Sequence, residues 1–159
     1  MPMILLMQNN PSASLDMGSP LIKLVGAARR LIRQSFWVRY APLGLTPQQG
    51  WILRELRARG PQSLHCLAQG VFMDDPTACR VVKPLHEKGL VASIPDPSHG
   101  RRIVLSLSET GAQVAPELDA IADQLGRDLA AGLSTAELDS LRGGLLKLIA
   151  NLSSPVPPA

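Results

Sequence analysis

Five side chains suited to binding an anionic surface stand in two short stretches near the middle of the chain. In the first stretch, Thr77, Arg80 and Lys83 follow one another at three-residue intervals. In the second, Arg101 and Arg102 are adjacent and lie among turn-forming residues. A guanidinium group binds phosphate or a guanine edge through paired hydrogen bonds, and an ammonium group binds phosphate as a point charge. These residue types predict contact with a nucleic acid.

Two helices are predicted to position the first stretch. Ser63 is a good N-cap for a short first helix, because its hydroxyl can accept a backbone N–H. Asp75 followed by Pro76 predicts the start of the second helix, because the carboxylate can cap and proline at the first position loses no hydrogen bond. Gly89 predicts its end, since glycine tolerates the left-handed backbone there. The apolar residues at helical spacing are Leu64, Leu67, Ala68, Val71, Ala78, Val81, Val82 and Leu85.

A β-hairpin is predicted to carry the two arginines near its tip. Residues 90–94 and 103–107 are short β-prone runs, and they flank a turn-rich segment at 95–102. A helix-turn-helix followed by a basic hairpin is the outline of a winged helix. In that arrangement the second helix suits the major groove of DNA and the hairpin arginines suit the minor groove. The predicted DNA contacts are Pro76, Thr77, Cys79, Arg80, Lys83, Arg101 and Arg102.

The sequence resembles the MarR family of winged helix-turn-helix transcriptional regulators from about Leu45 to Leu152. The segments that carry the resemblance are Leu45–Gln49, Leu67–Ala68 through Gly89–Leu90–Val91, Asp96–Pro97, Gly100–Arg101–Arg102 and Leu105–Gly111. Each segment is a weak signal, but their order and spacing together are specific. The resemblance implies a DNA-binding regulator, most often a repressor. It also implies a homodimer whose first, fifth and sixth helices interleave.

Three residues depart from the family pattern. Phe72 stands where many members have glycine, so we expect Gly70 to supply the positive backbone angle in the turn. Pro84 lies inside the second helix of the motif, where it removes one hydrogen bond and should kink the last turn. We interpret it as a trait of a subgroup. His99 replaces an acid that is common in the hairpin, which weakens any ion pair expected there.

The composition agrees with a globular DNA-binding protein. A chain of 159 residues can bury a core, and 45% hydrophobic and 18% charged residues are ordinary for a soluble domain. Residues 1–102 carry 13 Lys and Arg against 6 Asp and Glu, a net charge of +7, whereas residues 103–159 carry 3 against 7, or −4. A charge excess is often only a solvated face. Here it coincides with the helix-turn-helix and the hairpin, which favours phosphate contact.

Apolar helices are predicted on both sides of the winged helix. Apolar residues repeat at helical spacing between Pro20 and Arg39 and again from Val114 onward, where Pro116 should bend the helix or mark its start. A capping box of Ser134 and Glu137 opens a last helix. One small winged helix cannot bury all these stripes, so we predict a two-fold dimer.

The predicted fold is mainly α with a small β-wing. A flexible arm is expected over residues 1–18 and a single domain over 19–152. Within that domain we expect the winged helix at about 45–108 and dimerisation helices at about 19–40 and 109–152. A disordered tail is expected over 153–159. An arm that packs across the dimer is the alternative for the first segment.

The sequence favours neither an enzyme nor a metal site, and no cofactor is predicted. It contains no Gly-rich phosphate loop, nucleophile elbow or His-Glu-x-x-His motif. His65 and Cys66 are neighbours, so on a helix they point about 100° apart and cannot act as a base and nucleophile pair. No apolar run approaches the ~20 residues of a membrane span. Two cysteines without a secretion signal predict reduced thiols in the cytoplasm.

A small aromatic acid or phenolic ligand is the class of effector expected for this chain. The resemblance implies a pocket between the dimer helices and the winged helix, often for aromatic or phenolic acids. Arg33 lies four positions before Trp37, and a guanidinium beside an indole suits an aromatic carboxylate. The candidate effector residues are Arg30, Arg33, Trp37, Tyr40, Trp51 and His65, and Arg29 lies on the same predicted helix as the other two arginines. The alternative is that the tryptophans fill a junction between layers and the arginines are solvated or touch DNA.

Two other functions are left open by the sequence. Cys79 or Cys66 could make the chain a regulator that responds to thiol oxidation, although small core-filling residues are the simpler interpretation of both. A winged helix can also serve as a protein-interaction module. The basic second helix and the paired arginines argue against that module.

Overall fold

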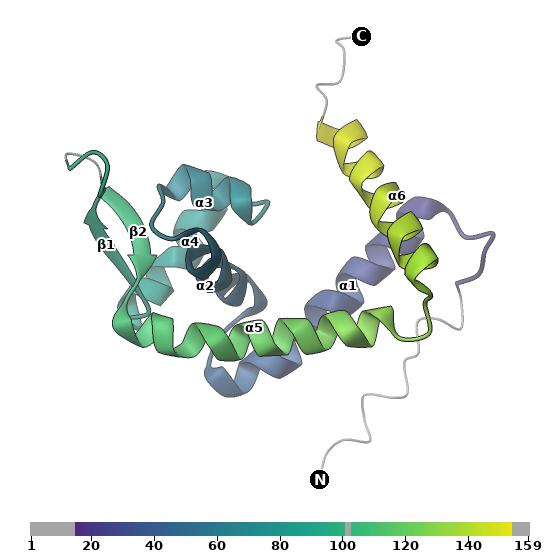
Figure 1. The fold of residues 1–159 in the computed structure, drawn as a ribbon, viewed down its shortest axis with the longest axis horizontal. Helices are drawn as coiled ribbons and strands as arrows, with labels where there is room; N and C mark the ends of the chain where they lie inside the picture. The colour runs from purple at the N-terminus through teal and green to yellow at the C-terminus, as the bar shows by residue number, and fades with distance from the viewer. Residues whose placement is uncertain (1–14, 101–102, 154–159) are drawn as a thin grey trace. The chain divides into compact units, whose positions relative to one another are not determined.

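The computed structural model describes residues 15–100 and 103–153 (Figure 1). Its elements are α1 (Leu21–Tyr40), the 3-10 turn η2 (Ala41–Leu43), α2 (Pro47–Arg59), α3 (Leu64–Gly70), α4 (Asp75–Glu87), β1 (Val91–Pro95), β2 (Ile103–Leu107), α5 (Glu109–Ala130) and α6 (Thr135–Ser153). The predicted fold class, mainly helical with a small β-wing, is confirmed.

The chain divides into two compact units, with the boundary inside α5 between Ala122 and Asp123. The first unit contains α1 to α4, the hairpin and the first part of α5, and the second contains the rest of α5 and α6. The expectation of one domain over residues 19–152 stays a prediction, as do the arm and the tail. Residues 1–14 and 154–159 lie outside the described part.

Side chains at the helix starts cap free backbone N–H groups. The Ser63 hydroxyl accepts from the Cys66 N–H at 3.2 Å, and Ser134 forms the predicted capping box with Glu137. At the start of α4 the cap is Asp74 rather than Asp75, since the Asp74 carboxylate accepts from the Thr77 N–H at 2.6 Å. Pro76 is consequently the second helical residue, where it still costs no hydrogen bond.

The core of the first unit is built almost entirely from aliphatic side chains. Its largest fully buried side chains are Tyr40, Ile52, Leu53, Leu67, Leu85 and Leu118. Tyr40 donates its hydroxyl to the Leu118 carbonyl at 3.3 Å, and burial raises the pKa of this phenol. α2 approaches Tyr40 closely at Gly50, where a Cβ would lie 2.2 Å from Cε2 of the ring. Glycine is therefore required at that crossing.

The turn between α3 and α4 contains a phenylalanine in a left-handed conformation. Phe72 has φ 55°, whereas Gly70 is the last residue of α3 and is absent from the positive-φ glycines of the described chain. The expectation that Gly70 supplies the positive angle is wrong. A Cβ at residue 70 would lie 2.1 Å from Oε1 of Glu55, so a larger residue there would displace that carboxylate. The Phe72 N–H donates to the Gln69 carbonyl and the Met73 N–H to the Ala68 carbonyl, which closes α3.

Two helices continue through internal prolines. α4 includes Pro84 and ends in the predicted way, with Gly89 at φ 68° just beyond it. α5 begins at Glu109 and continues through Pro116, so Pro116 does not mark its start. A kink in the last turn of α4 stays a prediction.

The hairpin and its junction with α5 complete the winged helix. β1 and β2 pair antiparallel from Val91↔Leu107 to Pro95↔Ile103, and Gln62 adds one bridge to Leu105. Figure 1 shows the hairpin projecting beyond α2, α3 and α4. At its base the Ser108 hydroxyl donates to the Gly89 carbonyl at 2.6 Å and accepts from the Gly111 N–H at 3.0 Å.

Large apolar side chains are exposed on the terminal helices. Within the described chain α6 has no buried residue, and α1 buries only Phe36 and Tyr40. The exposed apolar residues of these two helices include Leu21, Ile22, Val25, Leu31, Leu141, Leu145, Leu146, Ile149 and Leu152. No helix in the described residues is long and apolar enough to cross a bilayer.

Candidate functional site

The outer face of α4 presents the side chains predicted to contact DNA. Ala78, Val82 and Leu85 are buried in the first unit, as the helical periodicity requires. On the opposite face Pro76, Cys79, Arg80 and Lys83 are exposed and Thr77 is half-buried. Nη2 of Arg80 donates to the Thr77 hydroxyl at 3.1 Å, which orients the guanidinium along this face. Arg101 and Arg102 lie outside the described residues.

Acidic groups stand at the start of α4, beside these cations. Asp74 caps the helix, and hydrogen bonds from the Thr77 hydroxyl and N–H hold the pKa of its carboxyl below the ordinary value. Asp75 lies 3.1 Å from Nδ1 of His65 on α3. The amide nitrogen of Gln69 lies 3.0 Å from Nε2 of the same ring, so an imidazole protonated on Nδ1 satisfies both contacts. His65 therefore joins α3 to the start of α4.

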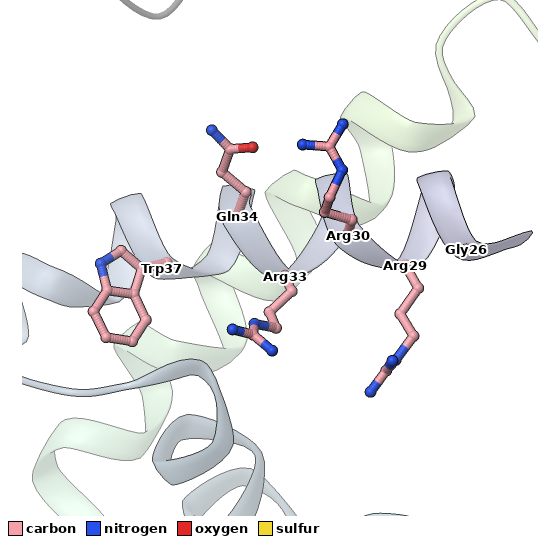
Figure 2. A pocket seen from close by; sticks show the side chains of 6 residues that line it. All are labelled: Gly26, Arg29, Arg30, Arg33, Gln34 and Trp37. Carbon is pink, nitrogen blue, oxygen red and sulfur yellow. The ribbon is translucent and has the colours of Figure 1, made fainter. Parts of the chain in front are cut away.

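A first cavity, of about 440 Å³, lies along α1. It is lined by Gly26, Arg29, Arg30, Arg33, Gln34 and Trp37 (Figure 2). Figure 2 shows that Arg29 and Arg33 project from one side of the helix and Arg30 and Gln34 from the other. Trp37 is 53% exposed. Because its cations diverge, this hollow does not direct all of them at one ligand.

A second cavity, of about 530 Å³, lies between helices of the first unit and the turn that precedes α4. Its lining residues are Arg29, Arg33, Gln48, Trp51, Arg54, Glu55, Ala58, Gly70, Val71, Phe72 and Asp119. Two arginines of α2 pair with one carboxylate of α5. Nε of Arg54 lies 2.8 Å from Oδ1 of Asp119, and Nε of Arg57 lies 2.9 Å from Oδ2. This cavity combines aromatic walls with cations and carboxylates.

The cations of the second cavity differ in their partners. Arg54 is taken by Asp119, and Nε of Arg59, just outside the cavity, lies 2.8 Å from Oε1 of Glu55. Within residues 15–100 and 103–153, Arg29 and Arg33 make no ion pair with a carboxylate. They are therefore the cations available to an anionic ligand.

The predicted effector residues are distributed over several places. Arg33 lines both cavities, Arg30 and Trp37 line the first and Trp51 lines the second. Tyr40 is fully buried with its hydroxyl on Leu118, and His65 of α3 faces Asp75 at the start of α4, so neither is among the residues lining the two cavities. Sequence reasoning did not place Arg54, Glu55, Phe72 or Asp119 at a cavity. Only Phe72 gave a signal, as a departure from glycine in the turn.

The burial of the cysteines differs from the expectation that they fill the core. Cys66 and Cys79 are both exposed free thiols, so that expectation is wrong. Among the described residues no group of three or more His, Cys, Asp or Glu side chains is placed to hold a metal ion.

Comparison with known proteins agrees with the helix-turn-helix and wing. Residues 43–102 match the sequence profile of the MarR family. The HTH-type transcriptional regulator SarZ of Staphylococcus haemolyticus (strain JCSC1435) is 32% identical over 89 residues, which span 56% of this chain and 59% of SarZ. A probable transcriptional regulator from Pseudomonas aeruginosa, known from its crystal structure, shares 35% identity at a TM-score of 0.62, over 78% of this chain and 96% of that one. The chain belongs to the MarR family.

A more distant solved structure extends the likeness of fold over most of the chain. The structure of BpsR from Bordetella bronchiseptica matches with a TM-score of 0.71 and 23% identity, over 89% of this chain and 99% of BpsR. That structure concerns the regulation of BpsR binding to DNA by 6-hydroxynicotinic acid. At this identity the likeness concerns the fold alone. The resemblance to the MarR family is confirmed, and the family profile matches residues 43–102.

Proposed function

We propose that this MarR-family chain is a sequence-specific DNA-binding regulator that acts as a homodimeric repressor. The observation that carries the proposal is that the two faces of α4 differ. Ala78, Val82 and Leu85 are buried on one face, and Arg80 and Lys83 are exposed on the other. A helix held in this way can enter the major groove with its polar face free. SarZ is itself a transcriptional regulator.

Each side chain has a role in this proposal. Arg80 reads a base edge, with Thr77 holding its guanidinium in place at 3.1 Å. Lys83 contacts phosphate. Pro76 and Cys79 pack against the sugar-phosphate backbone at either side, and Arg101 or Arg102 enters the minor groove.

The exposed leucines of α6 support the homodimer. Leu141, Leu145 and Ile149 recur at four-residue spacing and are 52%, 41% and 46% exposed. A soluble protein rarely leaves such a stripe uncovered, and a second copy related by a two-fold axis is the commonest cover. A dimer presents two reader helices, so the operator should be an imperfect palindrome with half-sites about one DNA turn apart.

An electrophoretic mobility shift with DNA from upstream of the protein's own gene tests this function. We expect a specific complex that competitor DNA of unrelated sequence does not displace, and a footprint with two-fold symmetry. A protein that binds every duplex equally contradicts the sequence-specific part of the proposal, and one that binds no duplex favours the protein-interaction module.

We further propose that a small aromatic carboxylate binds in the second cavity and releases the operator. The carboxylate pairs with Arg29 or Arg33, which carry no ion pair among the described residues, and the ring lies against Trp51. The regulation of BpsR by an aromatic acid supports this ligand class. Benzoate or 6-hydroxynicotinate should weaken operator binding, and Arg33→Ala should remove the effect. If neither acid changes operator affinity, this part of the proposal fails while the DNA-binding function stands.

Thiol oxidation is a second candidate for the signal, because Cys79 is exposed on the DNA-facing side of α4. Oxidation there would add bulk and charge at the proposed DNA contact. Peroxide should then release the operator from the wild type and not from Cys79→Ser. Equal sensitivity of the two proteins contradicts this candidate.

A further inference from the structure

We propose that Phe72 is the residue through which a ligand in the second cavity acts on the reader helix. The proposal rests on the ligand-binding part of the proposed function and adds the element that transmits the signal. Phe72 lines the cavity and lies three residues before Asp75, where α4 begins. Phe72 thus belongs both to the cavity wall and to the turn that joins α3 to α4.

The conformation of Phe72 is unfavourable for its residue type. At φ 55° its Cβ is crowded by the following carbonyl, a conformation that glycine takes freely. Its side chain is 86% exposed, so burial does not offset this strain. A strained residue that gains nothing from packing is typical of a functional position.

The cavity offers a ligand two aromatic surfaces and two cations. Phe72 stands on the wall formed by the turn, and Trp51 stands on the wall formed by α2. Arg29 and Arg33 of α1 can receive a carboxylate, because Arg54 is already held by Asp119. A flat aromatic acid bound by these cations would meet the Phe72 ring with its apolar part.

The turn converts a contact at Phe72 into a change at α4. The Phe72 N–H bonds to the Gln69 carbonyl at 3.2 Å, and the Met73 N–H bonds to the Ala68 carbonyl at 2.9 Å. Both bonds depend on the left-handed backbone at residue 72. A ligand that binds better to another backbone conformation of Phe72 shifts the turn toward that conformation. This shift changes the orientation of α4 relative to α3. The ligand then weakens DNA binding without touching the DNA-facing side chains.

Phe72→Gly separates the role of the ring from that of the backbone, because glycine accepts the left-handed conformation but has no side chain. Phe72→Tyr keeps the ring. Met17→Ala is the matched control, since it removes a fully exposed apolar side chain that does not line the cavity. Operator affinity is measured by anisotropy of labelled operator DNA with and without 6-hydroxynicotinate or benzoate. Ligand binding is measured by calorimetry on the full chain.

The quantity compared is the ratio of the operator Kd with acid to that without acid. We expect Phe72→Gly to lower this ratio at least fivefold relative to the wild type, with weaker binding of the acid. Phe72→Tyr and Met17→Ala should match the wild type. An unchanged ratio in Phe72→Gly, or a tyrosine variant that behaves like the glycine variant, overturns the role of Phe72. A wild type that ignores both acids overturns the effector proposal and this inference together.

Discussion

A Cβ atom added to Gly111 would lie 2.0 Å from the carbonyl oxygen of Leu90. The two residues belong to the start of α5 and the entrance to the hairpin. The Leu90 carbonyl also accepts the Ser108 N–H at 3.1 Å, and the Ser108 hydroxyl bonds to the Gly111 N–H. Because the clash would be with backbone, no side-chain rotation can relieve it. The hairpin and α5 are therefore locked together at a point where only glycine fits.

Gly111→Ala should destabilise the fold. Forcing one methyl group into a filled space typically costs ~1–3 kcal/mol, and here the neighbour is backbone, so we expect the upper part of that range. The free energy of unfolding from urea titration measures it. Gly126→Ala is the matched control in the same helix, since nothing lies within 4 Å of its Cβ position. That substitution should stabilise α5 by up to ~1 kcal/mol, and equal effects of the two would contradict the locked junction.

Ile149→Glu should dissociate the dimer. The side chain lies within the exposed apolar stripe of α6, and a carboxylate there would lose its water on assembly. Light scattering at micromolar concentration should give the mass of a dimer for the wild type and of a monomer for the variant. Asn151→Glu, on a residue outside the stripe, is the control and should stay dimeric. A monomeric wild type would refute this account of the stripe.

Arg80→Ala should weaken operator binding by ~1–3 kcal/mol and relax preference at one base position. Lys83→Ala should weaken binding to all sequences and lower the slope of log Kd against log salt by about one. Arg102→Ala should act as Lys83→Ala does if the hairpin contact is mainly electrostatic. Arg142→Ala, on α6, is the control. Anisotropy titrations at several salt concentrations distinguish the two patterns, and unchanged affinity for both α4 variants would remove α4 from the interface.

The charge of Asp74 should make the start of α4 sensitive to acid. Hydrogen bonds from Thr77 lower the pKa of this carboxyl below its ordinary 3.8, so the native state favours the ionised form. Its stabilising contribution is present above pH 3.8 and is lost as pH falls through the lower native value. Asp74→Asn keeps a capping side chain without the charge. The difference in unfolding free energy between wild type and variant should be constant near neutral pH and shrink below pH 4, and a difference that grows with acid would contradict it.

Local patterns predicted much of α4 but not its first residue. Helical spacing identified the buried face because burial repeats with the turn of the helix. Asp74 and Asp75 are both good caps, and the sequence does not say whether Pro76 is the first or the second helical residue. The first helical residue depends on which of the two carboxylates accepts the hydrogen bond from the Thr77 N–H, and the sequence pattern does not distinguish them.

Long-range contacts explain two residues whose surroundings the sequence did not predict. Gly70 was expected to supply a backbone angle, but its missing Cβ makes room for Glu55, fifteen residues earlier. Tyr40 was among the candidate effector residues, and its hydroxyl donates to the carbonyl of Leu118, a partner 78 residues away. Helical or strand periodicity relates residues a few positions apart, so it cannot predict a contact over this distance in the sequence.

Pro84 makes the reader helix uneven along its length. Proline has no amide hydrogen, so the Arg80 carbonyl lacks the bond that the fourth following residue would donate. One backbone hydrogen bond fewer consequently connects the last turn of α4 to the rest of the helix. Amide protons after Pro84 should exchange with deuterium at a rate set by opening of that turn alone, while those between Ala78 and Lys83 exchange through opening of the whole unit. The end of the helix beyond Lys83 can thus loosen while the part that carries Thr77 and Arg80 stays formed.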